Sequence, residues 1–178
     1  MTPAIERFDD WADTQLERLR GHRLPDTVFL AASELGDWSK VWHLIGLLRA
    51  LRSKRNAVQA VELSVILGLE SLIVNQGVKR LFRRQRPTES GDERLQVRAP
   101  STSSFPSGHA SAGFCAATVL TSMAGRKTAP LWFGVAGIVA LSRPYVRIHH
   151  ASDIVGGAAV GLVLGRAAVA ARHALGRA

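Results

Sequence analysis

The sequence predicts an all-α, polytopic membrane bundle of about five to six helices with an amphipathic N-terminal helix. The first observation is composition: 47% of the 178 residues are hydrophobic and only 21% are charged. The second is distribution, because the charges cluster in residues 1–26, 49–56, 79–98 and 166–177 and leave nearly uncharged stretches between them. Several apolar stretches joined by short basic turns favour a membrane bundle over a soluble one. The length suits one domain, which we expect to span residues 1–178.

The N-terminal part of the chain predicts three elements. Apolar residues recur at near-helical spacing over residues 3–20, which indicates an amphipathic helix within the segment 1–26. Such a helix either lies at the membrane interface or packs on the bundle as a cap. Residues 28–51 are apolar but are broken at Gly36-Asp37, which predicts a short helix and then a membrane segment from about Lys40.

The remaining elements follow in order. Residues 57–78 predict a long helix whose polar side chains, Glu62, Glu70, Asn75 and Gln76, should face the bundle interior. Residues 88–105 are polar and predict a loop, whose role the sequence does not reveal. Residues 107–124 and 128–142 are nearly uncharged and predict two further helices. A last helix is expected over about 151–171, where Gly157, Gly161 and Gly165 are spaced by four and permit close helix packing.

The net charge of +9 indicates an anionic partner. Nucleic acid is disfavoured, because the basic residues alternate with apolar spans and match no common DNA-binding module. An anionic membrane surface and an anionic substrate remain.

The N-terminus is charged and lacks an apolar signal region, so we expect membrane insertion to use internal spans. The single cysteine, Cys115, lies in an apolar run and needs no role beyond packing.

Three cations are suited to hold a phosphate: Lys79, Arg86 and Arg143. Arginine donates two parallel hydrogen bonds to phosphate oxygens and stays protonated. The spacing of seven predicts that Lys79 and Arg86 share one face of a helix that Pro87 ends. The other arginines of this segment are expected to be solvated or to contact lipid headgroups; they are Arg80, Arg83 and Arg84.

Two histidines and a carboxylate complete a candidate phosphatase site. Ser107 and Gly108 begin an apolar helix, where a serine cap and free N–H groups make an anion site. His109 follows and is a candidate general acid. His149 and Asp153 are four residues apart, a spacing that lets the carboxylate orient a nucleophilic imidazole. We expect the neighbouring His150 to point elsewhere.

These segments resemble the signature of the type 2 phosphatidic acid phosphatase family, which also includes vanadium haloperoxidases. The family pattern is Lys, six residues, Arg-Pro; then Pro-Ser-Gly-His; then Ser-Arg, five residues, His, three residues, Asp. The chain fills every position in this order over residues 79–153, and the matching residues are Lys79, Arg86, Pro87, Pro106, Ser107, Gly108, His109, Ser142, Arg143, His149 and Asp153.

The resemblance implies a membrane lipid phosphatase that needs no metal or other cofactor and acts through a phosphohistidine. It implies that His149 is the nucleophile, His109 the general acid and Asp153 the partner of His149. The residues that it assigns to phosphate binding are Lys79, Arg86, Ser107, Gly108 and Arg143. Polyprenyl phosphates and diphosphates, polyprenyl-phosphosugar phosphates, phosphatidic acid and phosphatidylglycerol phosphate are all reasonable substrates.

Three alternatives stay open from the sequence alone. They are a vanadate-dependent haloperoxidase, a metal site built from His109, His149, His150 and Asp153, and a lipid-phosphate binding or transport protein without catalysis.

The loops with Arg52, Lys54, Arg55, Arg126 and Lys127 predict a cytoplasmic side, which would place the site on the extracytoplasmic face of the cell membrane. A homo-oligomer is possible, because the glycine row serves packing within or between chains.

Overall fold

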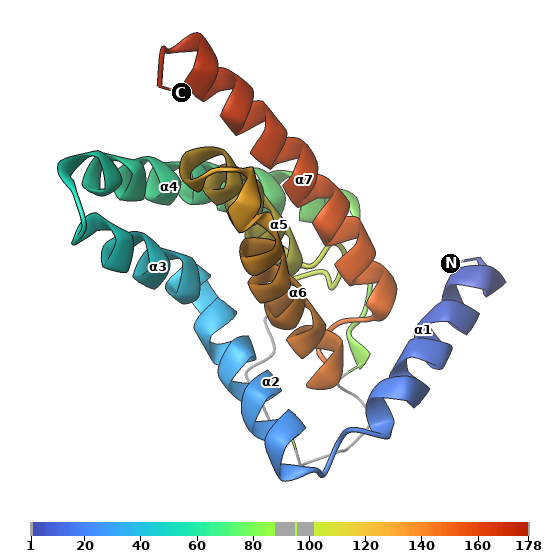
Figure 1. Ribbon diagram of the computed structural model, residues 1–178. Coiled ribbons are helices and arrows are strands. Elements are labelled where there is room, and N and C mark those ends of the chain that lie inside the picture. The colour runs from blue at the N-terminus through green and yellow to red at the C-terminus, as the bar shows by residue number, and fades with distance from the viewer. Residues whose placement is uncertain (1, 88–94, 96–101, 178) are drawn as a thin grey trace.

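The computed structural model describes residues 2–87, 95 and 102–177, and its regular elements within these ranges are all helical (Figure 1). The α-helices are α1 (Pro3–Glu17), α2 (Arg23–Gly36), α3 (Lys40–Ala50), α4 (Lys54–Leu72), α5 (Gly108–Ala124), α6 (Ala129–Tyr145) and α7 (Ala151–Ala174). Helices α2 to α7 form the bundle, and α1 is the amphipathic N-terminal helix that lies to one side. The predicted all-α fold is confirmed.

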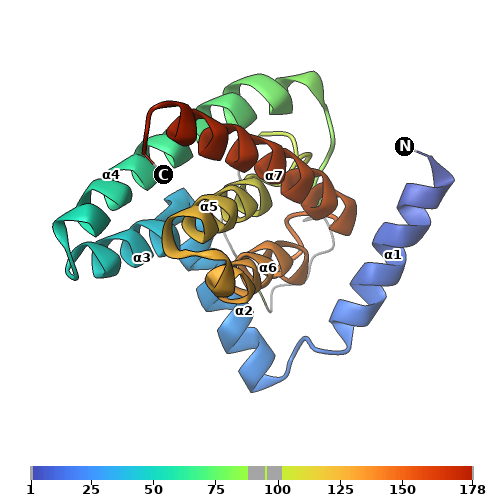
Figure 2. The same ribbon diagram turned by 45° about the horizontal axis from the view of Figure 1, so that its top comes forward.

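The core of the bundle is built around α5, whose small side chains let its neighbours approach closely. Ala110, Cys115 and Ala116 on this helix have no exposed surface. Figure 2 shows α5 running beside α6 and α7. A larger apolar cluster fills the space towards α3 and α4 and includes Trp42 and Leu63, both 1% exposed. Burial of this cluster follows from the apolar faces that the sequence places on these helices.

The row of glycines on α7 packs directly against the backbone of α5. A Cβ atom built on Gly161 would lie 2.9 Å from the Cα of Ser111, and one on Gly165 would lie 3.1 Å from the carbonyl oxygen of Cys115. Real Cβ atoms essentially never come within 3.0 Å of such an atom, so a side chain at Gly161 requires a shift of one helix, and 3.1 Å at Gly165 is tighter than most real contacts. The packing role predicted for the glycine row is confirmed.

Helix α1 contacts the bundle through polar side chains and turns apolar side chains outward. Asp9 is buried, and Arg20, just after the helix, donates to the carbonyl oxygens of Pro144 and Tyr145, each at 2.9 Å. These carbonyls end α6 and lack partners within that helix. The ring of Trp11 is 60% exposed. This arrangement, with the apolar face away from the protein, is typical of a helix at a membrane interface.

Two predicted breaks take different forms. The break between α2 and α3 occurs where expected, as a short 3-10 turn over Asp37–Ser39. The long helix ends earlier than the motif suggested: α4 passes into a π turn over Ile73–Gly77 and a 3-10 turn over Val78–Leu81, and the chain then becomes extended at Phe82. Lys79 and Arg86 therefore do not share one helix.

The polar residues predicted to line the bundle interior from α4 divide into two groups. Glu70 is 3% exposed, whereas Gln76 is exposed at the surface. On a regular helix the six-residue spacing already turns Gln76 about 120° away from Glu70, so the two side chains do not share one face. Most of the predicted loop 88–105 lies outside the described residues, apart from Leu95 and residues 102–105.

Two helical segments of the described chain are long and apolar enough to cross a membrane, Lys54–Leu81 and Ala151–Ala174. Helices α5 and α6 have 17 residues each, slightly fewer than the usual span of about 20. Large apolar side chains lie on the outer surfaces of four helices, which suits a lipid environment better than water. Among them are Leu44, Leu47, Val58, Val61, Val65, Leu69, Leu131, Ile138, Leu141, Val155 and Val163.

We predict that Gly161→Ala destabilises the protein by roughly 1–3 kcal/mol, because the added methyl group overpacks the contact between α7 and α5. The control is Gly137→Ala on α6, where an added Cβ has no neighbour within 4 Å. That control should be neutral or stabilising, since alanine is the better helix former by about 1 kcal/mol. Thermal unfolding in detergent measures both. Equal melting temperatures for Gly161→Ala and the wild type would contradict the close packing.

Candidate active site

Most of the motif residues meet in one cavity of about 750 Å³ at the end of the bundle where α2, α4, α5 and α6 converge with the segment before α7. Six of the eight predicted site residues line it: Lys79, Arg86, Gly108, His109, Arg143 and His149. Asp153 and Ser107 are fully buried behind this lining. Segments far apart in sequence are thus brought together as the motifs predicted.

His149 is held by two partners that fix which nitrogen carries its proton. Arg86 Nη1 lies 3.0 Å from His149 Nε2, and Asp153 Oδ2 lies 3.3 Å from His149 Nδ1. A guanidinium only donates hydrogen bonds and a carboxylate only accepts them. The proton is therefore on Nδ1, and Nε2 presents its lone pair to the cavity side, where Arg86 lies. A neutral imidazole in this tautomer is a nucleophile at Nε2.

Burial keeps His149 neutral. The side chain is 3% exposed, and this burial lowers the pKa of His149 to about 3, against the favourable effect of Asp153. The charges of Arg86 and Arg143 act in the same direction as burial. Burial also lowers the pKa of Arg86, but an arginine starts so far above neutrality that it stays protonated. The site therefore pairs a fixed cation with an uncharged base.

Arg86 reaches this position from an extended segment, not from a helix. Nη1 donates to the carbonyl oxygen of Ile148 at 2.8 Å, and Nη2 donates to those of Thr102 and Ser103 at 3.1 and 3.3 Å. The guanidinium therefore joins the segment after α4, the segment before α5 and the segment before α7. Its fork geometry is fixed beside His149 before any ligand arrives.

His109 also lines the cavity and has an acidic partner that the motifs did not indicate. Its Nε2 lies 3.0 Å from Asp37 Oδ1 and 3.2 Å from the carbonyl oxygen of Ser33. Both are acceptors, so Nε2 carries a proton. The hydrogen bond from His109 holds the pKa of Asp37 below its usual value. A Cβ on Gly36 would collide with this imidazole, so glycine there makes room for His109.

Arg143 and Lys79 supply further positive charge. Arg143 is 3% exposed and donates to the Ser33 hydroxyl, while its Nε has no hydrogen-bond partner within the described chain. A buried guanidinium N–H left without a partner is costly unless a ligand accepts it. Lys79 is also buried, with Nζ 3.7 Å from where a Cβ on Gly108 would lie. This places the ammonium beside the N-terminus of α5.

Ser107 acts as the N-cap of α5. Its Oγ accepts the N–H of Ala110 at 3.4 Å, and its own N–H donates to the carbonyl oxygen of Asp153 at 3.0 Å. The side chain is thus committed to the helix start. From this motif, Gly108 and His109 line the cavity, at the positive end of the helix.

Three residues have roles that the sequence did not reveal. Asp37 was expected only as a helix break, although an acid inside an apolar stretch is a signal of a buried partner. Arg84 was expected to be solvated, yet it donates to Asp153 Oδ1 at 2.5 Å, so that prediction was wrong. His150 is the N-cap residue of α7, and its backbone N–H donates to Asp153 Oδ2 at 2.9 Å. Nothing in the spacing of the arginines distinguished Arg84 from Arg83.

The metal-site alternative lacks a ligand cluster in the part of the chain that the structure describes. No three His, Cys, Asp or Glu side chains there are grouped so that they could hold a metal ion. The cavity instead combines cations with histidines, a set of groups that suits an anion.

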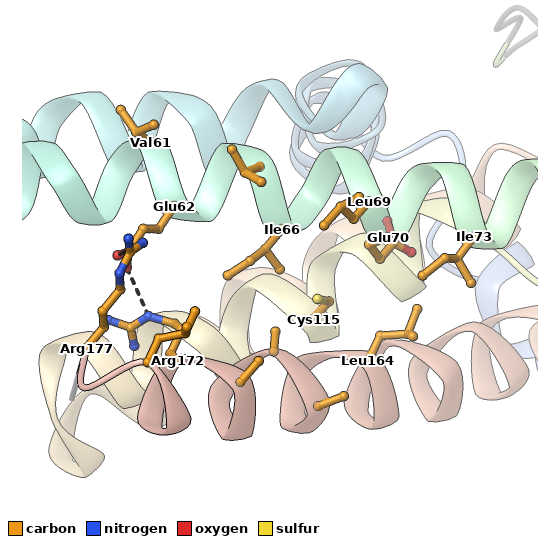
Figure 3. Close-up of a pocket in the computed structure, with 15 residues that line it drawn as sticks. Val61, Glu62, Ile66, Leu69, Glu70, Ile73, Cys115, Leu164, Arg172 and Arg177 are labelled. Atoms are coloured by element: carbon orange, nitrogen blue, oxygen red, sulfur yellow. Dashed lines mark hydrogen bonds and ion pairs between the residues drawn. The ribbon is translucent and has the colours of Figure 1, made fainter.

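A second cavity of about 470 Å³ lies between α4 and α7 and is mostly apolar (Figure 3). Glu62 closes one end through ion pairs with Arg172 and Arg177, both at 3.0 Å. Glu70 lies towards the other end and lines both cavities. The apolar groove and the cationic cavity are therefore neighbours that share Glu70 in their linings.

The chain is similar in sequence to named phosphatases. It is 33% identical over 129 residues to a decaprenylphosphoryl-5-phosphoribose phosphatase of Mycolicibacterium smegmatis, a match that covers 71% of this chain and 68% of the relative. It is 39% identical over 89 residues to the protein of the same name from Mycobacterium tuberculosis, covering 49% of this chain and 48% of that relative.

Solved structures share the fold. A transmembrane PAP2 type phosphatidylglycerolphosphate phosphatase from Bacillus subtilis matches with a TM-score of 0.71 and 20% identity, over 97% of this chain and 88% of that one. Aquifex aeolicus LpxE matches with a TM-score of 0.68 and 22% identity, over 85% and 88% of the two chains. A bacterial vanadium-dependent iodoperoxidase gives a TM-score of 0.61 at 16% identity, over 94% of this chain but 48% of its own.

The sequence profile of the PAP2 superfamily matches residues 59–177, which include every motif residue that lines the cavity. The resemblance expected from the three motifs is confirmed, as are the helical fold and the membrane character that it implied. The chain therefore belongs to the PAP2 superfamily.

Proposed function

We propose that this membrane lipid phosphatase hydrolyses the phosphate monoester of a polyprenyl-phosphosugar phosphate and releases phosphate. The reaction proceeds through a phosphohistidine on His149. The observation that carries the mechanism is the neutral His149, with Asp153 at Nδ1 and the cation of Arg86 at Nε2. The substrate class is supported by the name of the relative that is 33% identical over most of its length. A phosphorylated sugar head also suits a cavity of about 750 Å³ better than a bare phosphate does.

The chemistry has two steps. The Nε2 lone pair of His149 attacks phosphorus and the bond from phosphorus to the sugar oxygen breaks, while His109 gives a proton to that oxygen. Water then attacks the phosphohistidine with His109 as the base, which releases phosphate and restores both histidines. Arg86, Arg143, Lys79 and the N-terminus of α5 hold the charge of the phosphoryl oxygens in both steps.

Asp37 and Asp153 support the two histidines in opposite roles. Asp153 stabilises the positive charge that His149 acquires on attack. Asp37, 3.0 Å from His109 Nε2, favours the protonated imidazole that the leaving oxygen requires. Each of the two histidines thus has its own carboxylate partner.

The lipid chain is proposed to lie in the apolar groove between α4 and α7. This groove is lined by side chains such as Val65, Ile66 and Leu164, and it adjoins the cationic cavity at Glu70. An isoprenoid chain in the groove would keep its headgroup beside Arg86 and His149.

We also propose several membrane crossings with the site on the extracytoplasmic face. The turn between α3 and α4, the turn between α5 and α6, and the C-terminus lie at the same end of the bundle in both views (Figures 1 and 2). That end carries Arg52, Lys54, Arg126 and Lys127, and positive charge favours the cytoplasmic side. The catalytic cavity lies towards the other end.

We predict that detergent-purified protein releases phosphate from a polyprenyl-phosphosugar phosphate with chelator present, and that His149→Ala abolishes this release. The comparison panel holds polyprenyl phosphates and diphosphates, phosphatidic acid and phosphatidylglycerol phosphate. His173→Ala is the control, because His173 is exposed and lines neither cavity. Wild-type turnover in His149→Ala would sink the mechanism, and a better substrate elsewhere in the panel would replace the proposed one.

We predict that Asp37→Asn lowers kcat about tenfold or more for the lipid substrate with little change in KM, because general acid catalysis contributes about 10²–10⁴-fold. p-Nitrophenyl phosphate, whose leaving group needs no proton, should be much less affected. Glu34→Gln on α2 removes an exposed charge as a control. An equal loss of kcat for both substrates would contradict the link between Asp37 and His109.

We predict that His149 makes the protein less stable as pH falls. Its pKa is about 3 in the folded protein and roughly 6.5 when unfolded, so between these values the unfolded chain binds more protons. Stability should therefore drop on acidification from pH 6.5, by about 2 kcal/mol at pH 5. Melting temperatures at pH 7 and pH 5 measure this slope, which should be shallower in His149→Gln. Identical slopes in the two proteins would show that His149 is not held neutral.

A further inference from the structure

Arg84 lies between two buried carboxylates that come from opposite ends of the chain. Its Nη2 donates to Asp9 Oδ2 at 2.6 Å, and its Nη1 donates to Asp153 Oδ1 at 2.5 Å and to the Ser152 hydroxyl at 2.7 Å. We propose that Asp9 and Arg84 are positioning residues that hold Asp153, and through it His149, in the geometry of attack. This inference rests on the proposed role of His149 and extends the site to the N-terminal helix.

The oxygens of Asp153 are divided between two tasks. Oδ2 faces the Nδ1 of His149 and accepts the backbone N–H of His150, while Oδ1 accepts from Arg84. The carboxylate has no exposed surface, so bulk solvent does not reach either oxygen. Without Arg84, Oδ1 loses this charged donor, and the carboxylate is held by the contacts of Oδ2 alone. The imidazole of His149 would then lose the orientation that directs Nε2 at phosphorus.

Arg84 is itself fixed at both ends. Its backbone N–H donates to the Ser103 hydroxyl at 3.2 Å, and its carbonyl oxygen accepts the N–H of Ser104 at 3.0 Å. The guanidinium is 13% exposed, and its two carboxylate partners are 6% and 0% exposed. Charge-assisted bonds between buried groups are among the strongest contacts in proteins, and their geometry is specific. The arrangement is suited to orienting Asp153 rather than to presenting a charge to solvent.

Asp9 anchors this arrangement from α1. Its Oδ1 accepts the backbone N–H of Ser152 and its Oδ2 accepts the Ser152 hydroxyl, each at 2.8 Å. Ser152 is in the first turn of α7, where backbone N–H groups lack partners and negative charge is favoured. Asp9 therefore caps α7 from another helix and also holds Arg84.

Position in the chain distinguishes these residues from the motif. Arg84 falls in the unspecified stretch between Lys79 and Arg86, and Asp9 precedes residues 59–177, the part that matches the superfamily. The N-terminal helix, which turns Phe8 and Trp11 outward, thus carries a residue that touches the support of the proposed nucleophile. The catalytic centre of this chain is completed by a segment outside the matched region.

The test compares two matched pairs of variants. Arg84→Gln and Arg83→Gln remove the same charge from neighbouring positions, and Arg83 is exposed. Asp9→Asn and Asp10→Asn do the same on α1, where Asp10 is exposed. We expect kcat to fall roughly 10- to 100-fold in Arg84→Gln and less in Asp9→Asn, with KM nearly unchanged, since small misplacements of a reacting group cost about that much. The two controls should keep wild-type kcat.

Rescue and additivity separate positioning from simple anchoring. Arg84→Lys keeps the charge but not the two-sided fork, so it should recover part of kcat. The double variant of Asp9 and Arg84 should lose no more than Arg84→Gln alone, because both act along one chain of contacts. Melting temperatures are measured alongside. Loss of stability in Arg84→Gln with no change in kcat, or equal kcat in Arg84→Gln and Arg83→Gln, would overturn the proposal.

Binding of orthovanadate keeps the test independent of the lipid. Vanadate adopts the five-coordinate geometry of phosphoryl transfer and should bind the wild type more tightly than Arg84→Gln, by about tenfold. If no lipid is cleaved but this difference appears and is absent in Arg83→Gln, the proposed substrate fails and the positioning role stands. If lipid is cleaved and the vanadate affinities of wild type and Arg84→Gln are equal, the positioning role fails alone.

Discussion

The structure depends on one electrostatic constraint, which is that several cations must be kept close together in a buried place. Arg86, Arg143 and Lys79 repel one another there, and burial weakens the hydration of each. The fold offsets this cost with Asp37 and Asp153, whose carboxylates also hold the two histidines. A phosphate dianion completes the balance, so the site is most stable when it holds the charge that it is proposed to bind.

The constraint explains why the helices approach as they do. Helix α5 must bring its N-terminus to the proposed phosphate site while α7 brings Asp153 next to His149. This is possible only if the two helices run nearly in contact, and the glycines of α7 against the backbone of α5 allow that contact. The exposed apolar surface of the outer helices plays no part in this geometry and belongs to the interaction with lipid.

Much of this could be predicted from the sequence, because the motifs carry both residue type and spacing. The convergence of Lys79, Arg86, His109 and His149 followed from the motifs, and the packing role of Gly161 followed from its spacing. The end of α4 could not be predicted, because a π turn and a 3-10 turn replace the regular helix before Phe82. Asp37 and Arg84 were missed because their partners are distant in sequence and only the fold brings them together. His109 is 72 residues from Asp37, and Asp153 is 69 residues from Arg84.

The contact between Arg86 and His149 has a consequence for selectivity in a lipid environment. The lone pair of Nε2 accepts from a guanidinium that the carbonyl oxygens of Ile148, Thr102 and Ser103 hold in place, so the positive charge stays beside the proposed nucleophile. A phosphate dianion is drawn to that charge, whereas the carboxylic esters that make up most of a bilayer are neutral and are not. In the proposed mechanism, Arg86 thus makes attack by His149 selective for phosphate over the surrounding acyl lipids.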